Sequence, residues 1–437
     1  MTTTLKTYPE YKESSLEWTA GIPSDWEKRR FKFIFNLIKR PISVDDEIIT
    51  AFRDGTVTLR RNRKEDGFTI ALKEIGYQGV RSGDLVISGM DGFAGAIGIS
   101  DSDGKATPVY SICQPIQKSV FPNYYKYLLR VLALSGYISI LARGIRERST
   151  EFKWNVIGNL LLVVPNFETQ KNIANYLDEK TKVIDELVSK KEKMIELLRE
   201  KRSSLITQAV TKGLDSKVKM KDSEIDWLGE VPTEWKKIPL KFLFSYQSGG
   251  VWGDEARNDA NDLICVRVAD FDFVEFTAHS TDFTYRNLPD IKKELLLNEN
   301  SILLEKSGGG DQQTVGRTVR YLEKEPATCS NFIQKLQVDK KYNSEFIILL
   351  LSTLYFNGVT LKVIKKTTGI QNLDLPAFLR TDIFLPSKNE QKQIVDFVNV
   401  KSTNIIDSIK KMNQQIDQLK EYRSSLIYSV VTGKIKV

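Results

Sequence analysis

A glycine-rich stretch in the second half of the chain carries side chains that are suited to reading nucleic acid. It runs EKSGGGDQQTVGR from Glu305 to Arg317 and lacks the Gly-Lys-Ser/Thr ending of a phosphate-binding loop. Glutamine pairs in a bidentate manner with adenine, and arginine with guanine. The stretch therefore predicts either a tight turn between strands or a loop that approaches DNA. The candidate contacts under the second interpretation are Lys306, Ser307, Gln312, Gln313 and Arg317.

A second glycine-rich stretch, SGMDGFAGAIG, runs from Ser88 to Gly98. Its glycines are spaced GxxGxxG rather than as the dinucleotide-binding GxGxxG, and no helix clearly opens after it. We therefore expect no nucleotide site here, and again either a tight turn or a loop against a nucleic-acid groove. The candidates are Ser88, Met90 and Asp91, to which the second half of the chain adds Trp252.

Three basic patches flank these stretches. A single patch of this kind is more often a solvated surface than a binding site, and the charge alone does not decide between the two. Their candidate residues are Arg53, Arg60, Arg61, Arg63 and Lys64 in the first patch, Arg143, Arg146, Arg148 and Lys153 in the second, and Lys365, Lys366 and Gln371 in the third. The second and third patches each lie just before a repeated helical segment, which favours a shared role.

The chain contains no arrangement of residues that is typical of catalysis. There is no Pro-Pro pair for a base-flipping loop, and His279 is the only histidine. The nuclease-like run Asp178-Glu179-Lys180 falls inside an expected helix without an upstream carboxylate. We therefore expect no catalytic residue, and no metal or cofactor bound by the chain itself.

Composition is compatible with a nucleic-acid partner and a cytoplasmic location, although a solvated basic surface explains the same charge. Among 437 residues Lys and Arg exceed Asp and Glu to give a net charge of +8, which favours a polyanionic partner. The three cysteines are widely spaced without a CxxC pair, as expected in a reducing compartment. No run of about 18 apolar residues predicts a membrane span.

Two segments of the sequence each occur twice, once in each half of the chain. WTAGIPSDWEKRRFKFIF, starting at Trp18, matches WLGEVPTEWKKIPLKFLF, starting at Trp227, and KRSSLITQAVTKG matches YRSSLIYSVVTGK with Arg202 and Arg423 in equivalent places. Repeats of this size indicate duplicated structural units. Between the repeats, short apolar runs bounded by Gly, Asp and Ser predict strands, so each half is expected to contain an α+β domain.

The repeated segments that close each half predict two long helices. Apolar residues recur at alternating spacings of three and four, which is typical of a coiled-coil seam. The seam residues are Ile173, Leu177, Ile184, Leu187, Ile195, Leu198, Leu205 and Ala209 in the first helix, and Ile405, Ile409, Met412, Ile416, Leu419, Leu426 and Val430 in the second. Gly213 and Gly433 are expected to end the helices. Each stripe needs a partner, which is either the other helix or a second copy of the chain.

These motifs together resemble the specificity subunit of type I restriction-modification enzymes. The resemblance covers nearly the whole chain, because the two entry motifs and the segments LLVVPNFETQKNIANYL and IFLPSKNEQKQIVDFV occur in order and in duplicate. Two departures stand out. Gly89-Met90-Asp91-Gly92-Phe93 replaces a usual Lys-Met-Lys-Ala-Trp run, and NFETQ replaces a commoner Pro-x-x-Glu-Gln start.

The resemblance implies an α+β protein with two target recognition domains, separated by two long antiparallel helices in a pseudo-twofold internal repeat. The expected segments are recognition domains at 1–160 and 216–381 and helical spacers at 161–215 and 382–437. Each recognition domain would read half of a bipartite double-stranded DNA site. Two methyltransferase subunits would dock on the helices, and motor-nuclease subunits join some assemblies. S-adenosylmethionine, ATP and Mg would belong to those partners only.

Two alternatives stay open at this point. The same subunit type in a related restriction system, outside type I, would look the same. A stand-alone bipartite DNA-binding regulator would also use duplicated domains, but it would bind its site without any methyltransferase. The exposed faces around Glu200, Arg202, Glu421 and Arg423 suit a methyltransferase contact and helix packing equally well.

Overall fold

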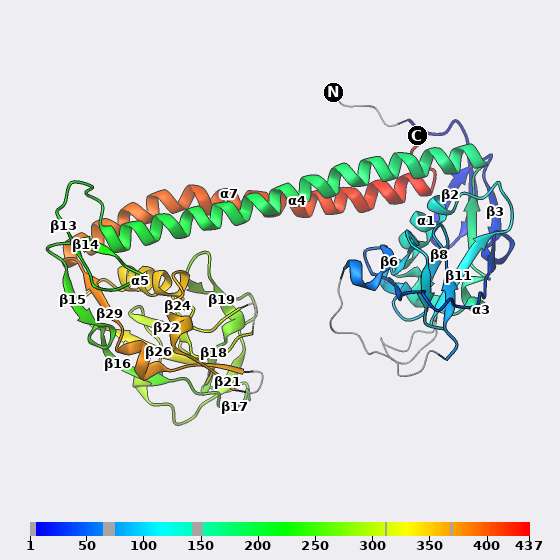
Figure 1. Cartoon of the computed structure of the whole chain (residues 1–437). Helices are drawn as coiled ribbons and strands as arrows, with labels where there is room; N and C mark the ends of the chain where they lie inside the picture. The colour runs from blue at the N-terminus through cyan, green and yellow to red at the C-terminus, as the bar shows by residue number, and fades with distance from the viewer. Residues whose placement is uncertain (1–5, 64–74, 142–151, 311–312, 368–369) are drawn as a thin grey trace. The chain divides into compact units, whose positions relative to one another are not determined.

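The computed structural model describes residues 6–63, 75–141, 152–310, 313–367 and 370–437. The chain forms two compact units. Unit 1 comprises Met1–Lys191 and Gln414–Val437, and unit 2 comprises Glu192–Asn413. Each unit combines strands, short helices and part of both long helices (Figure 1), which confirms the predicted α+β class with two globular domains and two long helices.

Unit 1 contains one larger sheet and several hairpins. Its strands are β1 (Tyr11–Leu16), β2 (Thr19–Pro23), β3 (Glu27–Arg30), β4 (Phe35–Leu37), β5 (Ile49–Ala51), β6 (Val57–Leu59), β7 (Gln78–Val80), β8 (Leu85–Ser88), β9 (Ile97–Ile99), β10 (Gly104–Ala106), β11 (Tyr110–Pro115) and β12 (Leu161–Val164). Its short helices are α1 (Pro122–Leu134), α2 (Tyr137–Leu141) and α3 (Trp154–Ile157). The larger sheet is antiparallel in the order β4-β11-β8-β9.

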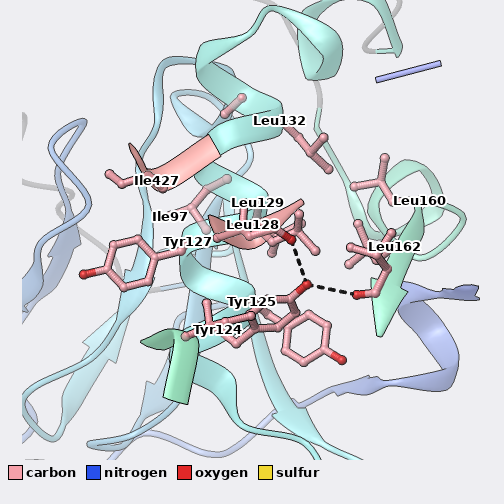
Figure 2. Close-up of a cluster of buried hydrophobic side chains, with 14 of the residues drawn as sticks. Ile97, Tyr124, Tyr125, Tyr127, Leu128, Leu129, Leu132, Leu160, Leu162 and Ile427 are labelled. Atoms are coloured by element: carbon pink, nitrogen blue, oxygen red, sulfur yellow. Dashed lines mark hydrogen bonds between the residues drawn. The ribbon is translucent and has the colours of Figure 1, made fainter. Parts of the chain in front are cut away.

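The alternating sides of β8 fill two cores, because successive side chains of a strand point to opposite faces. Leu85 and Ile87 pack against helix α1 and the aromatic residues around it, whereas Val86 faces the β5–β6 hairpin. On the α1 side the rings of Tyr124 and Tyr125 lie 5.0 Å apart, edge to face. Figure 2 shows this cluster, with Ile427 beside the leucines of α1.

Residues 414–437 complete unit 1. The Tyr124 hydroxyl, which is buried, donates a hydrogen bond to the Val431 carbonyl at 3.1 Å. Lys6 pairs with Lys436 in an isolated antiparallel bridge, and the Tyr11 hydroxyl donates to the Gly433 carbonyl at 2.9 Å. Segments far apart in the sequence therefore build one core.

Unit 2 follows the same plan with different strands. These are β13 (Met220–Asp222), β14 (Glu230–Pro232), β15 (Lys236–Pro239), β16 (Phe244–Gly249), β17 (Asp254–Glu255), β18 (Asp262–Val266), β19 (Phe271–Asp272), β20 (Thr277–Ala278), β21 (Tyr285–Asn287), β22 (Ser301–Glu305), β23 (Ser307–Gly308), β24 (Thr318–Tyr321), β25 (Ala327–Cys329), β26 (Ile333–Val338), β27 (Ile364–Thr367), β28 (Ile370–Leu373) and β29 (Asp382–Leu385). The short helices are α5 (Ser344–Phe356) and α6 (Leu375–Leu379).

A six-stranded sheet, in the order β16-β26-β22-β24-β20-β19, divides unit 2 into two cores. Ile302 and Leu304 of β22 pack with the apolar helix α5, while Leu303 faces the β17-β21-β18-β25 sheet. Helix α5 begins where the Asn343 side chain accepts hydrogen bonds from the backbone N–H groups of Glu345 and Phe346.

The two long helices that the seam pattern predicts are α4 (Phe167–Lys212) and α7 (Lys388–Val431). In unit 1 the start of α4 packs with the end of α7, and in unit 2 the end of α4 packs with the start of α7. The helices are therefore antiparallel and pair within the chain. Of the seam residues, Leu187 departs from the prediction, since its side chain is 42% exposed.

Both helices end at the predicted glycines, because Gly213 and Gly433 adopt φ values of +75° and +76° that favour glycine. Each helix is also fixed by a buried glutamine near its start. Gln170 accepts from the Phe121 N–H at 2.9 Å and donates to the Pro165 carbonyl at 2.8 Å.

In the other unit Gln391 repeats this pattern. It accepts from the Asn343 N–H at 2.9 Å and donates to the Pro386 carbonyl at 3.0 Å. The scaffold is thus duplicated down to single hydrogen bonds.

Candidate nucleic-acid interface

In unit 1 the glycine-rich stretch SGMDGFAGAIG forms the turn between β8 and β9. Ser88 is buried, and its hydroxyl accepts a hydrogen bond from the Asp91 N–H at 3.0 Å. A Cβ on Gly98 would lie 2.1 Å from the Gly55 carbonyl oxygen, so glycine is required there for close packing. The tight-turn interpretation therefore holds for Ser88 and Gly98, whereas Met90 at the tip of the turn is 51% exposed.

The first basic patch lies beside this turn. The Arg53 Nη2 atom is 2.7 Å from the Asp91 carboxylate, so the structure brings two candidates together in one exposed ion pair. Arg61 pairs with Glu47 at 2.6 Å, and Arg63 pairs with Asp54 at 2.7 Å while lying over the ring of Phe52.

Arg60 donates to the Thr50 hydroxyl at 3.2 Å. Because exposed ion pairs exchange readily with water and other charges, these groups remain accessible to a phosphate. Lys64 lies outside the described residues.

Of the second patch, Arg143, Arg146 and Arg148 lie outside the described residues. Lys153 precedes α3 and lines a cavity of about 1060 Å³. Met90 lines the same cavity, together with Tyr77, Pro108 and Trp154. The structure thus groups one basic candidate and one apolar candidate around a partly aromatic hollow, a combination that suits contact with a base or sugar.

In unit 2 the glycine-rich stretch EKSGGGDQQTVGR connects β22 with β24. Lys306 lies 3.4 Å from the Gln334 side-chain oxygen, and the Ser307 hydroxyl donates to Asn372 at 2.6 Å. Gln313 is exposed, and Gln312 lies outside the described residues. Lys306, Ser307 and Gln313 therefore belong to one surface loop.

Arg317 differs from the expected position. It is only 8% exposed, and its guanidinium contacts the Glu305 carboxylate through two hydrogen bonds of 2.7 and 3.1 Å. It also lies 4.0 Å from the centre of the Phe273 ring. The antiparallel pairing of β22 with β24 places these two charges side by side, so Arg317 stabilises the interior of the loop and does not present its guanidinium to a base.

Gln371 is likewise internal, at 5% exposure. Its side chain accepts from the Val315 N–H at 3.3 Å and donates to the Gly310 carbonyl at 3.0 Å, which fixes the glycine-rich loop against β28. The sequence pattern does not distinguish an amide that holds a loop from one that reads a base.

The third patch lies on the β27–β28 hairpin. Lys365 is exposed and lies 2.7 Å from the Asp374 carboxylate; its hydrogen bond lowers the pKa of that carboxyl. Lys366 belongs to the same strand, where its backbone pairs with Gln371, and its side chain lies outside the described residues. Lys365 thus places an exposed positive charge at the surface of unit 2.

Trp252 is 39% exposed and contacts Arg286, a residue that the sequence analysis did not identify. The Arg286 guanidinium stacks over its ring at 4.7 Å and donates to its carbonyl at 3.2 Å. Tyr285, next to it on β21, and Phe332, beside the glycine-rich loop, are exposed as well. Aromatic rings with a guanidinium at the surface suit stacking on bases and contact with phosphates.

The residue types that could bind a metal or act as nucleophiles have these surroundings. In the part of the chain that the structure describes, no group of three or more His, Cys, Asp or Glu side chains is placed to hold a metal ion. His279 pairs with Glu323 at 3.1 Å. Burial raises the pKa of the Cys265 thiol to about 11 and that of Cys329 to about 12, which disfavours the reactive thiolate. Among the described residues, no helix is long and apolar enough to cross a membrane.

Comparison with known proteins agrees with this geometry. Residues 232–418 match the type I restriction modification DNA specificity domain. The specificity subunit of the type I restriction enzyme MjaVIII from Methanocaldococcus jannaschii is 25% identical, covering 98% of this chain and 97% of its own. The MjaX specificity subunit of the same organism is 21% identical, covering 98% of each chain.

One solved structure is similar over nearly the whole length. It belongs to a study of complex assembly and conformational transition of the type I R-M system, and the similarity has a TM-score of 0.65 at 13% identity. It covers 95% of this chain and 99% of the other, and at this identity it supports the fold alone. The matched domain and the two sequence relatives carry the name of the same family.

Proposed function

The chain is a specificity subunit of the type I restriction-modification family, and on that premise we propose that each globular domain reads one half of a bipartite DNA sequence. The duplication carries this proposal. Gln170 and Gln391 hold the same hydrogen bonds in two units whose surface loops differ. A common scaffold with two different loops suits a target made of two different half-sites.

Two kinds of contact would divide the work of recognition. Exposed Lys and Arg side chains, among them Arg53, Arg61 and Lys365, would supply salt-dependent affinity for phosphates. Side chains at the loop tips would contact base edges and discriminate by about 1–3 kcal/mol for each good bidentate pair. In unit 1 we place Met90 and Lys153 in this second group, and in unit 2 Gln313, Trp252 and Arg286.

The long helices would fix the spacing between half-sites. Half-sites read from one face of DNA should lie about one helical turn, roughly 34–36 Å, apart from centre to centre. We expect that removing or adding one turn in both α4 and α7 changes the number of unspecified base pairs and leaves the half-sites unchanged. An unchanged gap in a methylation map of such a variant would refute this role.

The chemistry would belong to partner subunits. Two methyltransferase subunits that dock on the duplicated helix ends would bring S-adenosylmethionine, and motor-nuclease subunits would bring ATP and Mg in assemblies that cut DNA. The chain itself would carry out no reaction step in the cytoplasm. Incubation of the pure chain with DNA, magnesium and S-adenosylmethionine tests this, and product formed by the chain alone would contradict it.

The decisive experiment is co-expression with the neighbouring methyltransferase gene in a host free of adenine methylation. Single-molecule sequencing then maps N6-methyladenine across the genome, and we expect a bipartite motif with a fixed gap. An assembled complex without methylation would favour a stand-alone DNA-binding regulator instead. A partner that fuses nuclease and methyltransferase would assign the chain to a related restriction system.

A further inference from the structure

Two equivalent grooves lie where the RSSLI segments meet the globular domains. In unit 1 the groove has a volume of about 870 Å³ and is lined by Arg423, Ser424 and Ile427 of α7 together with Arg130 of α1. In unit 2 a groove of about 900 Å³ is lined by α4 and by residues from the end of α5. The repeat gives both grooves an arginine in the same place, Arg423 in one and Arg202 in the other.

The arginine of unit 1 is neutralised within the unit. The Arg423 Nε atom lies 2.9 Å from one oxygen of Asp185, and Nη2 donates to the other oxygen at 3.2 Å. Asp185 comes from α4, across the helix pair. The neighbouring Arg130 donates to the carbonyl oxygens of Gly95 and Arg53. Both arginines of this groove therefore already have acceptors.

The arginine of unit 2 has no such partner. Arg202 is only 9% exposed, and no carboxylate of the described residues lies within ion-pair distance of it. Its buried Nε atom makes no hydrogen bond, as is also true of the Nε of Arg423, so the two arginines differ in the ion pair. Its guanidinium lies over the ring of Phe276 at 4.6 Å. Burial lowers its pKa to about 10, which still leaves it protonated at neutral pH. A buried cation without a counter-ion is costly, so its persistence calls for an explanation.

The acidic side chains around Arg202 are engaged elsewhere. Glu275 pairs with Lys410 of α7, and Asp272 accepts hydrogen bonds from the backbone N–H groups of Val274 and Glu275. Glu345 pairs with Arg320 at 3.1 Å. Glu275 and Glu345 line a cavity together with Arg202, but none of the three carboxylates forms an ion pair with it as Asp185 does with Arg423.

The reason for the difference is one residue of α7. Counted from the first residue of each helix, Ile406 stands in α7 where Asp185 stands in α4. Ile406 and Arg202 line the same cavity of about 200 Å³, so the two side chains do face each other across the helix pair. Unit 2 keeps the arginine of the repeat but has lost its carboxylate.

We propose that Arg202 anchors a carboxylate-binding site in the unit 2 groove, which an acidic side chain of a docked methyltransferase subunit fills. The partner carboxylate approaches Arg202 from the groove and supplies the negative charge that Asp185 supplies in unit 1. The two docking sites are consequently unequal, since only the one on unit 2 gains a buried, charge-assisted hydrogen bond when the partner binds. This inference rests on the proposed assembly with methyltransferase subunits.

A carboxylate fits the groove better than a DNA phosphate does. The reference pair in unit 1 is a carboxylate presented by a helix, and the unit 2 groove is bordered by Phe271, Phe273 and Phe356, which suit an apolar protein surface. Asp270 and Glu200 also line it, and because their repulsion grows with the number of negative charges, a single carboxylate is opposed less than a polyanionic backbone.

The test measures both affinities of the purified methyltransferase subunit for the full chain, by native mass spectrometry and sedimentation. Arg202→Met keeps the packing on Phe276 without the charge, and Arg423→Met is its matched control. We expect Arg202→Met to weaken one of the two affinities at least about tenfold and Arg423→Met to change neither by more than about threefold. Ile406→Asp supplies the internal carboxylate and should weaken the same affinity without lowering the melting temperature.

The double variant Arg202→Met/Ile406→Asp should lose no more than either single change, because both act on one interaction. Unchanged affinities in Arg202→Met and Ile406→Asp, with two subunits still bound, would overturn this inference alone. Loss of DNA binding by the Arg202→Met chain, with partner affinity intact, would assign the groove to phosphate and also overturn it. A wild-type chain that binds no methyltransferase would overturn the proposed function together with the inference.

Discussion

The glycine-rich loops of the two units are held by ion pairs of different burial, although the scaffolds beneath them match. The unit 1 turn has a hydrogen bond to the buried Ser88 hydroxyl, but its ion pair, between Arg53 and Asp91, is at the surface. The unit 2 loop is tied from inside, by the Arg317–Glu305 pair and by Gln371. The contacts that position the domains on the helices are thus the same in both units, whereas the contacts that hold the two loops differ.

The largest test of this contrast is Glu305→Ala. Removing the carboxylate leaves Arg317 charged and buried, so we expect a loss of about 3–5 kcal/mol in the stability of unit 2. Because the chain has two units, hydrogen exchange of peptides from β22 and β24 is a better measure than one melting temperature. The matched control is Glu323→Ala, whose exposed pair with His279 should contribute little. Equal effects from both variants would contradict the internal role of Arg317.

The buried glutamines test the shared scaffold instead. Gln170→Ala and Gln391→Ala each leave a half-buried N–H and a buried carbonyl without this partner, so each should cost about 1–3 kcal/mol. The expected loss is the same in both units, and exchange rates at the N-termini of α1 and α5 would report it. A clear difference between the two variants would show that the units are less equivalent than their hydrogen bonds suggest.

Arg286→Ala addresses recognition by unit 2. Loss of the guanidinium over Trp252 should weaken DNA binding by about 1–2 kcal/mol. In a methylation map of the assembled complex, relaxed specificity is expected in one half-site only. The matched control is Arg257→Ala, an exposed arginine of the same unit that pairs with Asp254. Relaxation of both half-sites would break the assignment of one half-site to each unit.

The smallest expected effect belongs to Arg53→Ala. Its partner Asp91 is itself exposed, so the stability of unit 1 should change by at most about 1 kcal/mol. Loss of its phosphate contact should make the slope of log DNA affinity against log salt concentration shallower by about one. Unfolding of unit 1 by this single change would mean that its loop, too, depends on an internal tie.

The sequence was sufficient for features that depend on periodicity or repetition. The seam from Ile173 to Ala209, the glycines that end both helices and the α+β character of each half all follow from local patterns that were present twice. Exact repetition also made the equivalence of Arg202 and Arg423 visible before any contact was known.

Features that depend on strand pairing were not predictable. Whether Arg317 faces DNA or Glu305 depends on the register of β22 against β24, and nothing in the run EKSGGGDQQTVGR specifies that register. The stacking of Arg286 on Trp252 likewise requires β21 to lie beside the turn that carries the tryptophan. Residues of the same type therefore looked alike in the sequence and serve different purposes in the structure.

The make-up of unit 1 has a consequence for the order in which the protein is assembled during translation. Unit 2 is one continuous segment, Glu192–Asn413, whereas unit 1 joins Met1–Lys191 to Gln414–Val437. The ribosome therefore completes unit 2 before it supplies Ile427, Val430 and Val431 to the core around Tyr124. The half of the chain that is synthesised first therefore has an aromatic core that lacks one wall until the last residues are added.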